Sequence, residues 1–309
     1  MRKFKVNSDR IVGNNGKMFF RGQTIEESQI NPNAIGRYIA GKRIVELKDY
    51  SIPADRKIKL AIVTSVWGRY KVFDMFLKGL HELSVKCPDF EFYFIVSTSF
   101  QQDKEKCYDE EIDYESWFHP KYGELWDSNI RTSHIEIPNE PLAAKVNATT
   151  YAAGKLGVDY VLCMGSDDII SPELLNEYGK LMRKGIDFIG VTDFYFYDTV
   201  SKRSLYWGGY TEPNRKGHTA GAARCLSARL LDQWDWMPWE NKDSLMLDKS
   251  MQDKLKVTPH TIETFSMKEK GLFAVDIKSS TNMTPFEKWN NSDFIDNAIL
   301  QKQFPYIFD

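Results

Sequence analysis

The chain has 309 residues, 42% hydrophobic and 27% charged, which is ordinary for a globular protein with one large core. The formal net charge of −2 excludes a uniformly basic coat for nucleic acid, although a local basic groove remains compatible with it. Four cysteines without C-x-x-C pairing make a zinc site or a disulfide framework unexpected. With no signal-peptide pattern and no apolar run of about 20 residues, we expect a cytoplasmic protein without a membrane segment.

The first 52 residues differ in pattern from the rest of the chain. Two short strand patterns, "KFKVNSDRIV" and "KMFFRGQTI", are separated by the turn "GNNG". "NPNAIGRYIAGKRIVEL" then predicts a short helix, a glycine turn and a closing strand. We therefore expect a small β-barrel-like accessory module over residues 1–52, linked to a larger domain over residues 53–309.

In the larger domain, strand patterns alternate with helix patterns. The run "IKLAIVTSV" is apolar throughout, as in a parallel strand covered on both faces. Further strands are expected at 90–99, 159–165 and 187–198, and helices at 69–83, 140–157 and 171–185. This alternation predicts an α/β fold with a mostly parallel, Rossmann-like sheet, and in such sheets ligands bind beyond the carboxyl ends of the strands.

An acidic pair stands where one of these strands ends. "DYVLCMGSDDIISPELL" runs from a buried strand into Ser166, Asp167 and Asp168 and then into a helix. Carboxylates at this edge suit Mg²⁺ or Mn²⁺ bound to a diphosphate, since these ions take oxygen ligands and neutralise a leaving phosphate. The alternative is a helix N-cap cluster, because the helix dipole also favours carboxylates there.

Three motifs follow one another around this pair. They are the loop from Thr64 to Arg69 ("TSVWGR"), the helix start N-x-P-L-x-x-K-x-N from Asn139 to Asn147, and the element Ser166-Asp167-Asp168. Their order resembles that of GT-A fold glycosyltransferases, especially the family 2-like group encoded by bacteriophages, over roughly residues 58–285. The resemblance implies transfer of a sugar from a nucleotide-sugar donor, and a UDP-sugar is the first candidate for that donor. It also implies that Mn²⁺ or Mg²⁺ binds the diphosphate.

The resemblance also implies roles for the acidic element. Asp168 would be the metal ligand, and Asp167 would contact the donor sugar or the ribose. Ser166 departs from the family pattern, which has an acidic residue there. A serine can still donate a hydrogen bond to ribose, but strict metal dependence is less firmly implied.

Four further residues are carried over in the same way. Thr64 and Arg69 would border the nucleotide, and Lys145 and Asn147 would face the donor sugar or the diphosphate. Each has a structural alternative: Thr64 as a helix cap, Arg69 as a solvated side chain at a helix start, and Lys145 on an exposed helix face.

The segment "WDWMPWENKDSLMLDKSM" combines three tryptophans with acids, and a helix is expected to begin near Leu247. Direct displacement of a sugar needs a carboxylate that removes the proton of the acceptor hydroxyl. The family places this base at a helix start here, and Asp248 matches it best, with Glu240 and Asp243 as alternatives. The family resemblance includes the segment V-D-I-K-S of the late strand "FAVDIKS", which implies a phosphate-facing Lys278 or an additional acidic contact.

The sequence does not define the acceptor. Related phage enzymes imply 5-hydroxymethylpyrimidine in double-stranded DNA as the first hypothesis, and a capsid protein or surface glycan as the second. A non-catalytic module that binds a nucleotide sugar or nucleic acid is the alternative of another class. A nucleotidyltransferase would also use acids and a metal, but "TSVWGRY" lacks the glycine- and lysine-rich phosphate loop usual there.

Overall fold

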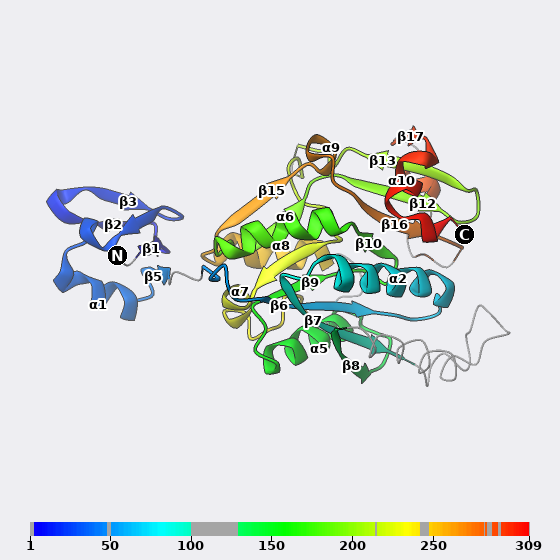
Figure 1. Ribbon diagram of the computed structural model, residues 1–309. Coiled ribbons are helices and arrows are strands. Elements are labelled where there is room, and N and C mark those ends of the chain that lie inside the picture. Colours follow the sequence, from blue (N-terminus) through cyan, green and yellow to red (C-terminus); the bar gives the residue numbers. More distant parts are fainter. Residues whose placement is uncertain are drawn as a thin grey trace.

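The computed structural model describes residues 3–47, 51–99, 129–213, 215–241, 247–280, 282, 286–289 and 292–308. The first of these ranges forms a small group of elements with its own hydrophobic core, drawn in blue in Figure 1. Its elements are β1 (Lys3–Val6), β2 (Arg10–Val12), β3 (Met18–Phe20), β4 (Thr24–Glu26), α1 (Pro32–Ala40) and β5 (Ile44–Leu47). The strands make a three-stranded sheet, β4-β1-β5, and a separate two-stranded ribbon, β2-β3, so the described residues form two small sheets where the sequence predicts a barrel-like module.

A seven-stranded sheet in the order β15-β11-β14-β9-β6-β7-β8 organises the rest of the chain. Its strands are β6 (Ile58–Ser65), β7 (Phe90–Thr98), β8 (Ile130–Glu136), β9 (Tyr160–Cys163), β11 (Phe188–Val191), β14 (Arg224–Ser227) and β15 (Ile262–Phe265). All neighbours are parallel except the two pairs that β14 makes. The sheet is therefore mostly parallel, as the alternation of strands and helices predicts.

Helices cover both faces of this sheet (Figure 1). On β6, Leu60 and Ile62 belong to one core cluster and Ala61 and Val63 to the other, because successive side chains of a strand point to opposite faces. The first cluster takes in α2 (Tyr70–Lys86) and α6 (Pro172–Arg183), and the second takes in α5 (Leu142–Lys155), α7 (Ala228–Asp232) and α8 (Leu247–Val257). Burial on both faces accounts for the unbroken apolar run of this strand.

A second, five-stranded sheet in the order β10-β16-β12-β13-β17 was not expected from the sequence. Its strands are β10 (Asp168–Ile170), β12 (Phe194–Asp198), β13 (Arg203–Trp207), β16 (Ala274–Lys278) and β17 (Asp293–Ile295). The acidic pair therefore leads into the short strand β10 before α6 begins, and the expectation of a direct passage into a helix was wrong. Ser171 does cap α6, accepting a hydrogen bond from the Leu174 N–H (3.2 Å).

The single strand expected over residues 187–198 is two strands, one in each sheet. The chain breaks at Asp193, whose carboxylate accepts hydrogen bonds from the Met267 N–H (2.6 Å) and the Ser266 hydroxyl (2.6 Å). These groups lie at the start of α9 (Met267–Lys270). An apolar run cannot reveal such a break, because both halves are equally buried.

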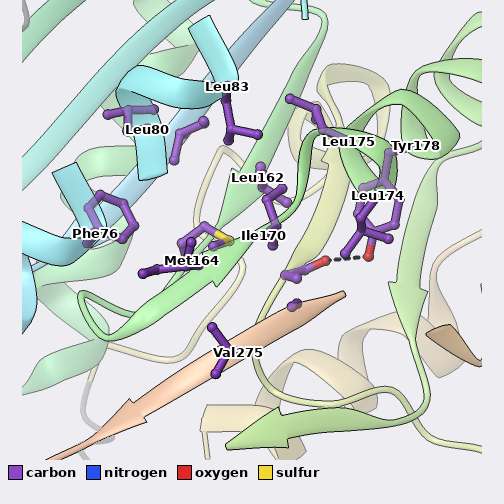
Figure 2. Packing of buried hydrophobic residues seen from close by; sticks show 14 of the residues in the cluster. Phe76, Leu80, Leu83, Leu162, Met164, Ile170, Leu174, Leu175, Tyr178 and Val275 are labelled. Atoms are coloured by element: carbon purple, nitrogen blue, oxygen red, sulfur yellow. Dashed lines mark hydrogen bonds between the residues drawn. The ribbon is translucent and has the colours of Figure 1, made fainter. Parts of the chain in front are cut away.

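The two sheets share one core, and Figure 2 shows its centre. On one side of this core, α2 contributes Phe76, Leu80 and Leu83, which face Leu162 of β9 and Ile170 of β10. On the other side, α6 contributes Leu174 and Tyr178. The Tyr178 hydroxyl donates to the Ala223 carbonyl (2.8 Å), which satisfies it inside the core. The residues that follow the acidic pair are thus anchored in well-packed apolar surroundings.

The C-terminal part of the chain packs against the same core. Leu300 of α10 (Asn297–Gln303), Phe304 and Ile307 are fully or almost fully buried there. Among the described residues, no helix combines the length and the hydropathy needed to cross a membrane.

Candidate functional site

A cleft of about 580 Å³ opens where β6 and β9 end. Ser65 and Arg69 from the loop after β6 form one part of its wall, and Lys145 from the first turns of α5 forms another. Asp168 and Asp276 line the part formed by β10 and β16. The carboxyl ends of parallel strands and an edge of the second sheet therefore meet in one cleft, which is where ligands of α/β sheets bind.

Two carboxylates of this cleft stand opposite each other across a strand pair. In the antiparallel pairing of β10 with β16, Asp168 is the register partner of Asp276. The Ile277 N–H donates to the Asp167 carbonyl (2.7 Å), so the neighbouring Asp168–Asp276 pair is non-hydrogen-bonded. In such pairs the Cα atoms are about 4.5 Å apart and the side chains come closest. Like charges in this position repel, so the pair favours a bound cation.

Gly165 lets the acidic element fold back on itself. Its N–H donates to Asp168 Oδ2 (2.6 Å), which fixes that carboxylate. A Cβ on Gly165 would lie 2.5 Å from Asp167 Oδ1 and 2.7 Å from Asp168 Oδ2, closer than real Cβ atoms come to oxygen. Only glycine therefore allows both carboxylates to lie over this backbone. Gly165 was not among the site residues predicted from the sequence, although a glycine just before Ser166-Asp167-Asp168 is a signal that could have indicated it.

Two cations from distant parts of the chain balance the acids. Arg69 forms an ion pair with Asp167, and the Asn282 side-chain amide donates to the same carboxylate (2.7 Å). Lys278 is a residue only 4% exposed, and its ammonium donates to Asp276 Oδ2 (2.6 Å). Asp167 is thus held from two sides, whereas Asp168 receives only a backbone donor from the described residues.

Burial governs the protonation of this cluster. Burial, with the charges of Asp167 and Asp276 added to it, raises the pKa of Asp168 well above its ordinary value. Burial also raises the pKa of Asp276 to about 6, against the lowering effect of Lys278. Burial by itself lowers the pKa of Lys278, but Asp276 and Asp167 more than offset this and leave it raised. The ammonium therefore stays charged while the two opposed carboxylates resist ionising together.

The donor set fits a divalent cation that is shared with a phosphate ligand. Asp276 Oδ1 is buried without a hydrogen-bond partner among the described residues, beside the Asp168 carboxylate. In the part of the chain that the structure describes, no three His, Cys, Asp or Glu side chains form a complete metal site. Mg²⁺ and Mn²⁺ are commonly held by one or two carboxylates plus substrate phosphates and water, so two carboxylates are enough.

Lys145 and Ser166 both border this cleft. Lys145 is 1% exposed, and its ammonium donates to Asn139 Oδ1 (3.0 Å) and lies 3.4 Å from the Val66 carbonyl oxygen. It therefore does not lie on the exposed helix face that was its alternative, but ties the start of α5 to the loop after β6. Ser166 is 2% exposed within the acidic element.

Two predicted site residues, Thr64 and Asn147, do not line the cleft. Thr64 is buried inside β6, and its hydroxyl has no hydrogen-bond partner among the described residues. The Asn147 amide donates to the Trp239 carbonyl (2.8 Å) and to Asn241 Oδ1 (2.6 Å), and Asn147 Oδ1 accepts from the Trp239 N–H (3.1 Å). Asn147 thus holds the chain around Trp239, which does border the cleft.

The other tryptophans of that segment serve packing. The Trp234 indole donates to Thr258 Oγ1 (2.8 Å), and the Trp236 indole to Asp232 Oδ1 (2.8 Å). Asp248 is the second residue of α8, so a helix begins at the expected place and Leu247 borders the cleft. The side chain of Asp248 and the whole of Asp243 lie outside the described residues.

The fold belongs to a definite class: α/β, with a large, mostly parallel central sheet, like that of GT-A-type glycosyltransferases. Among solved structures, residues 1–349 of TarS from S. aureus, in complex with UDP-GlcNAc, match with a TM-score of 0.50 and 14% identity, over 81% of this chain and 72% of that chain. The mannosyltransferase PcManGT from Pyrobaculum calidifontis, in complex with GDP-Man and Mn²⁺, matches with a TM-score of 0.48 and 10% identity, over 84% and 67%.

Nucleotidyltransferase-type structures match as well. A UDP-glucose pyrophosphorylase complexed with UDP-glucose gives a TM-score of 0.37 at 9% identity, over 71% of this chain and 90% of that chain. No protein-family model matches the sequence, and no curated protein matches it either. At 14% identity the match to TarS shows the fold alone, and the chemistry of the cleft has to be argued from its own residues.

Proposed function

We propose that this chain is a glycosyltransferase that moves a sugar from a nucleotide-sugar donor, a UDP-sugar foremost, to a hydroxyl group. The observation that carries the proposal is the cross-strand pair Asp168–Asp276, with its unpartnered Asp276 oxygen, in a cleft at the carboxyl ends of β6 and β9. A cleft of about 580 Å³ is in the range of small-molecule sites.

Asp168 and Asp276 would hold Mn²⁺ or Mg²⁺, which when bound supplies positive charge against the diphosphate leaving group. Arg69 and Lys278 supply two further cations on either side of the acids, and both can stabilise phosphate oxygens. Asp167, which Arg69 and Asn282 hold, would accept hydrogen bonds from the donor's ribose or sugar hydroxyls. We assign Ser166 and Lys145 to the donor side of the same cleft.

In the transfer step, the acceptor oxygen forms a bond to the anomeric carbon while the bond from that carbon to the diphosphate oxygen breaks. The acceptor proton passes to a carboxylate base, for which Asp248 at the start of α8 is our assignment. The products are the glycosylated acceptor and a nucleoside diphosphate. Trp239, whose backbone Asn147 holds, borders the cleft and would lie on the acceptor side.

As the acceptor we favour 5-hydroxymethylpyrimidine in double-stranded DNA, as the resemblance to phage enzymes implies. Its hydroxymethyl group is displayed in the major groove and is reachable without unpairing the base. The decisive experiment incubates the full chain with a panel of nucleotide sugars and Mn²⁺, and follows nucleoside diphosphate release with hydroxymethylated duplex, with plain duplex and without acceptor.

We expect one donor to be consumed with the hydroxymethylated duplex only. Donor that binds and is never consumed with any acceptor would instead indicate a binding module. Pyrophosphate release from a nucleoside triphosphate and a sugar phosphate would indicate a nucleotidyltransferase.

A further inference from the structure

The ribbon β2-β3 near the N-terminus presents large apolar side chains to solvent. In its pairing, Val12 lies opposite Met18, and Arg10 lies opposite Phe20. Val12, Met18 and Phe20 are 50%, 52% and 51% exposed. Ile11 and Phe19, on the other face, are buried in the core of the module. The outer face therefore carries three large apolar side chains beside Arg10 on a two-stranded ribbon, which indicates an interaction site.

The charge around this ribbon is opposite in sign to the rest of the chain. Residues 1–47 hold nine Lys and Arg against four Asp and Glu, a net charge of +5, whereas residues 48–309 hold 32 against 39, a net charge of −7. Arg10 lies on the exposed ribbon face opposite Phe20, and Lys17 and Arg21 adjoin the ribbon in sequence; all three are exposed, and Arg21 forms an ion pair with Asp9 (3.1 Å). Arg43 joins them, donating to the Arg10 carbonyl (2.9 Å). A cationic module on an acidic protein favours a polyanionic partner.

We propose that the β2-β3 ribbon binds double-stranded DNA in the major groove. The strands of a ribbon are about 4.8 Å apart, so a ribbon with its side chains fits a groove about 12 Å wide. Arg10, Lys17 and Arg21 contact the flanking phosphates, and Met18 and Phe20 contact the C5 substituents of pyrimidines. The proposal rests on the proposed function for its biological meaning, because C5 is the position that carries the hydroxymethyl acceptor group.

A second copy of the chain fits this face less well. Two modules of net charge +5 repel each other when their ribbons meet face to face. A duplex presents a row of negative charges about 1.7 Å apart along its axis together with apolar C5 groups, which matches both features of the ribbon.

The test measures binding of the full chain to a labelled 20-base-pair duplex, without donor or metal, at several salt concentrations. The double variant Arg10→Glu/Arg21→Glu should bind about tenfold more weakly or worse, with a salt slope about two smaller in magnitude. Phe20→Ser should weaken binding with little change in the slope. The matched control for Phe20→Ser is Phe294→Ser, whose side chain is 55% exposed. The control for charge reversal is Lys302→Glu, at another exposed position in the C-terminal part. Both controls should bind as the wild type does.

Unchanged unfolding midpoints establish that all the variants are folded. Wild-type binding that the ribbon variants leave intact, or no duplex binding at all, overturns the proposal. If the ribbon variants change the sedimentation coefficient and leave duplex binding unchanged, the ribbon face binds a second copy of the chain, and the proposal is overturned. The proposed function is tested separately: Asp168→Asn should keep duplex binding and lose sugar transfer, whereas the ribbon variants should keep donor binding.

Discussion

Asp168 and Asp276, 108 positions apart in the sequence, are register partners in one antiparallel strand pair and face the same cleft. Each is flanked by a cation or a donor that fixes it: the Gly165 N–H for Asp168 and the Lys278 ammonium for Asp276. Placing the buried Asp168 carboxylate opposite the partly buried Asp276 carboxylate destabilises the fold, and a bound cation would offset this repulsion.

Asp168→Asn should abolish sugar transfer and leave the protein folded. Removing a metal ligand forfeits several kcal/mol of leaving-group stabilisation, so we expect a fall in kcat of about 100- to 10,000-fold. Chelation of divalent cations should do the same to the wild type, and added Mn²⁺ should restore it. Full activity of the variant in the presence of a chelator would remove the metal from the mechanism.

Gly165→Ala should displace both carboxylates of the acidic element, because the new Cβ would lie 2.5 and 2.7 Å from their oxygens. We expect donor and Mn²⁺ binding to weaken at least tenfold in calorimetric titrations. The control is Gly36→Ala in α1, where a Cβ would meet nothing within 4 Å. That control should bind normally and be equally or more stable, since alanine is the better helix former by about 1 kcal/mol. Equal binding by the two variants would contradict the geometry of the acidic element.

Protonation of Asp276 should couple stability to pH in the metal-free protein. Since its pKa is raised to about 6 in the fold, its contribution to stability is fully present below pH 4 and is lost as the pH rises through about 6. The free energy of unfolding of the wild type, relative to Asp276→Asn, should therefore fall by about 3 kcal/mol over this window. Mn²⁺ affinity should rise over the same window, because the cation binds the ionised carboxylate. A relative free energy that does not change with pH would contradict this assignment.

Asn147→Ala should reduce turnover without abolishing donor binding, because Asn147 holds the backbone at Trp239 and does not line the cleft. Loss of these buried hydrogen bonds should cost about 1–3 kcal/mol of stability. The matched control is Thr149→Val on the same helix, whose hydroxyl donates to the Val146 carbonyl of its own helix (2.8 Å). It should retain kcat. Loss of donor affinity in Asn147→Ala, at unchanged kcat, would assign Asn147 to the donor instead.

Asp248→Asn should remove the general base and lower kcat by about 100- to 10,000-fold, with donor affinity retained. Glu240→Gln, at the exposed alternative position in the same region, should leave kcat within a few-fold of the wild type. Rapid-quench measurement of a single turnover separates this chemical step from product release. If Asp248→Asn transfers sugar normally and Glu240→Gln does not, the base is Glu240.

The sequence by itself determined the local elements and their order. The apolar run of β6, the capped start of α6 and the helix that begins at Leu247 follow from side-chain periodicity and capping groups, which act over a few residues. It also placed the acidic pair at the end of a central strand. Each of these features is encoded within one stretch of chain.

Only the tertiary structure decided the second sheet and the composition of the cleft. The break at Asp193 depends on groups more than 70 residues away, and the opposition of Asp168 and Asp276 depends on the register of two distant strands. The burial of Lys145 and the engagement of Asn147 with Trp239 arise in the same way. Such contacts are set by how sheets and helices pack against each other, and a pattern in neighbouring residues carries no record of that packing.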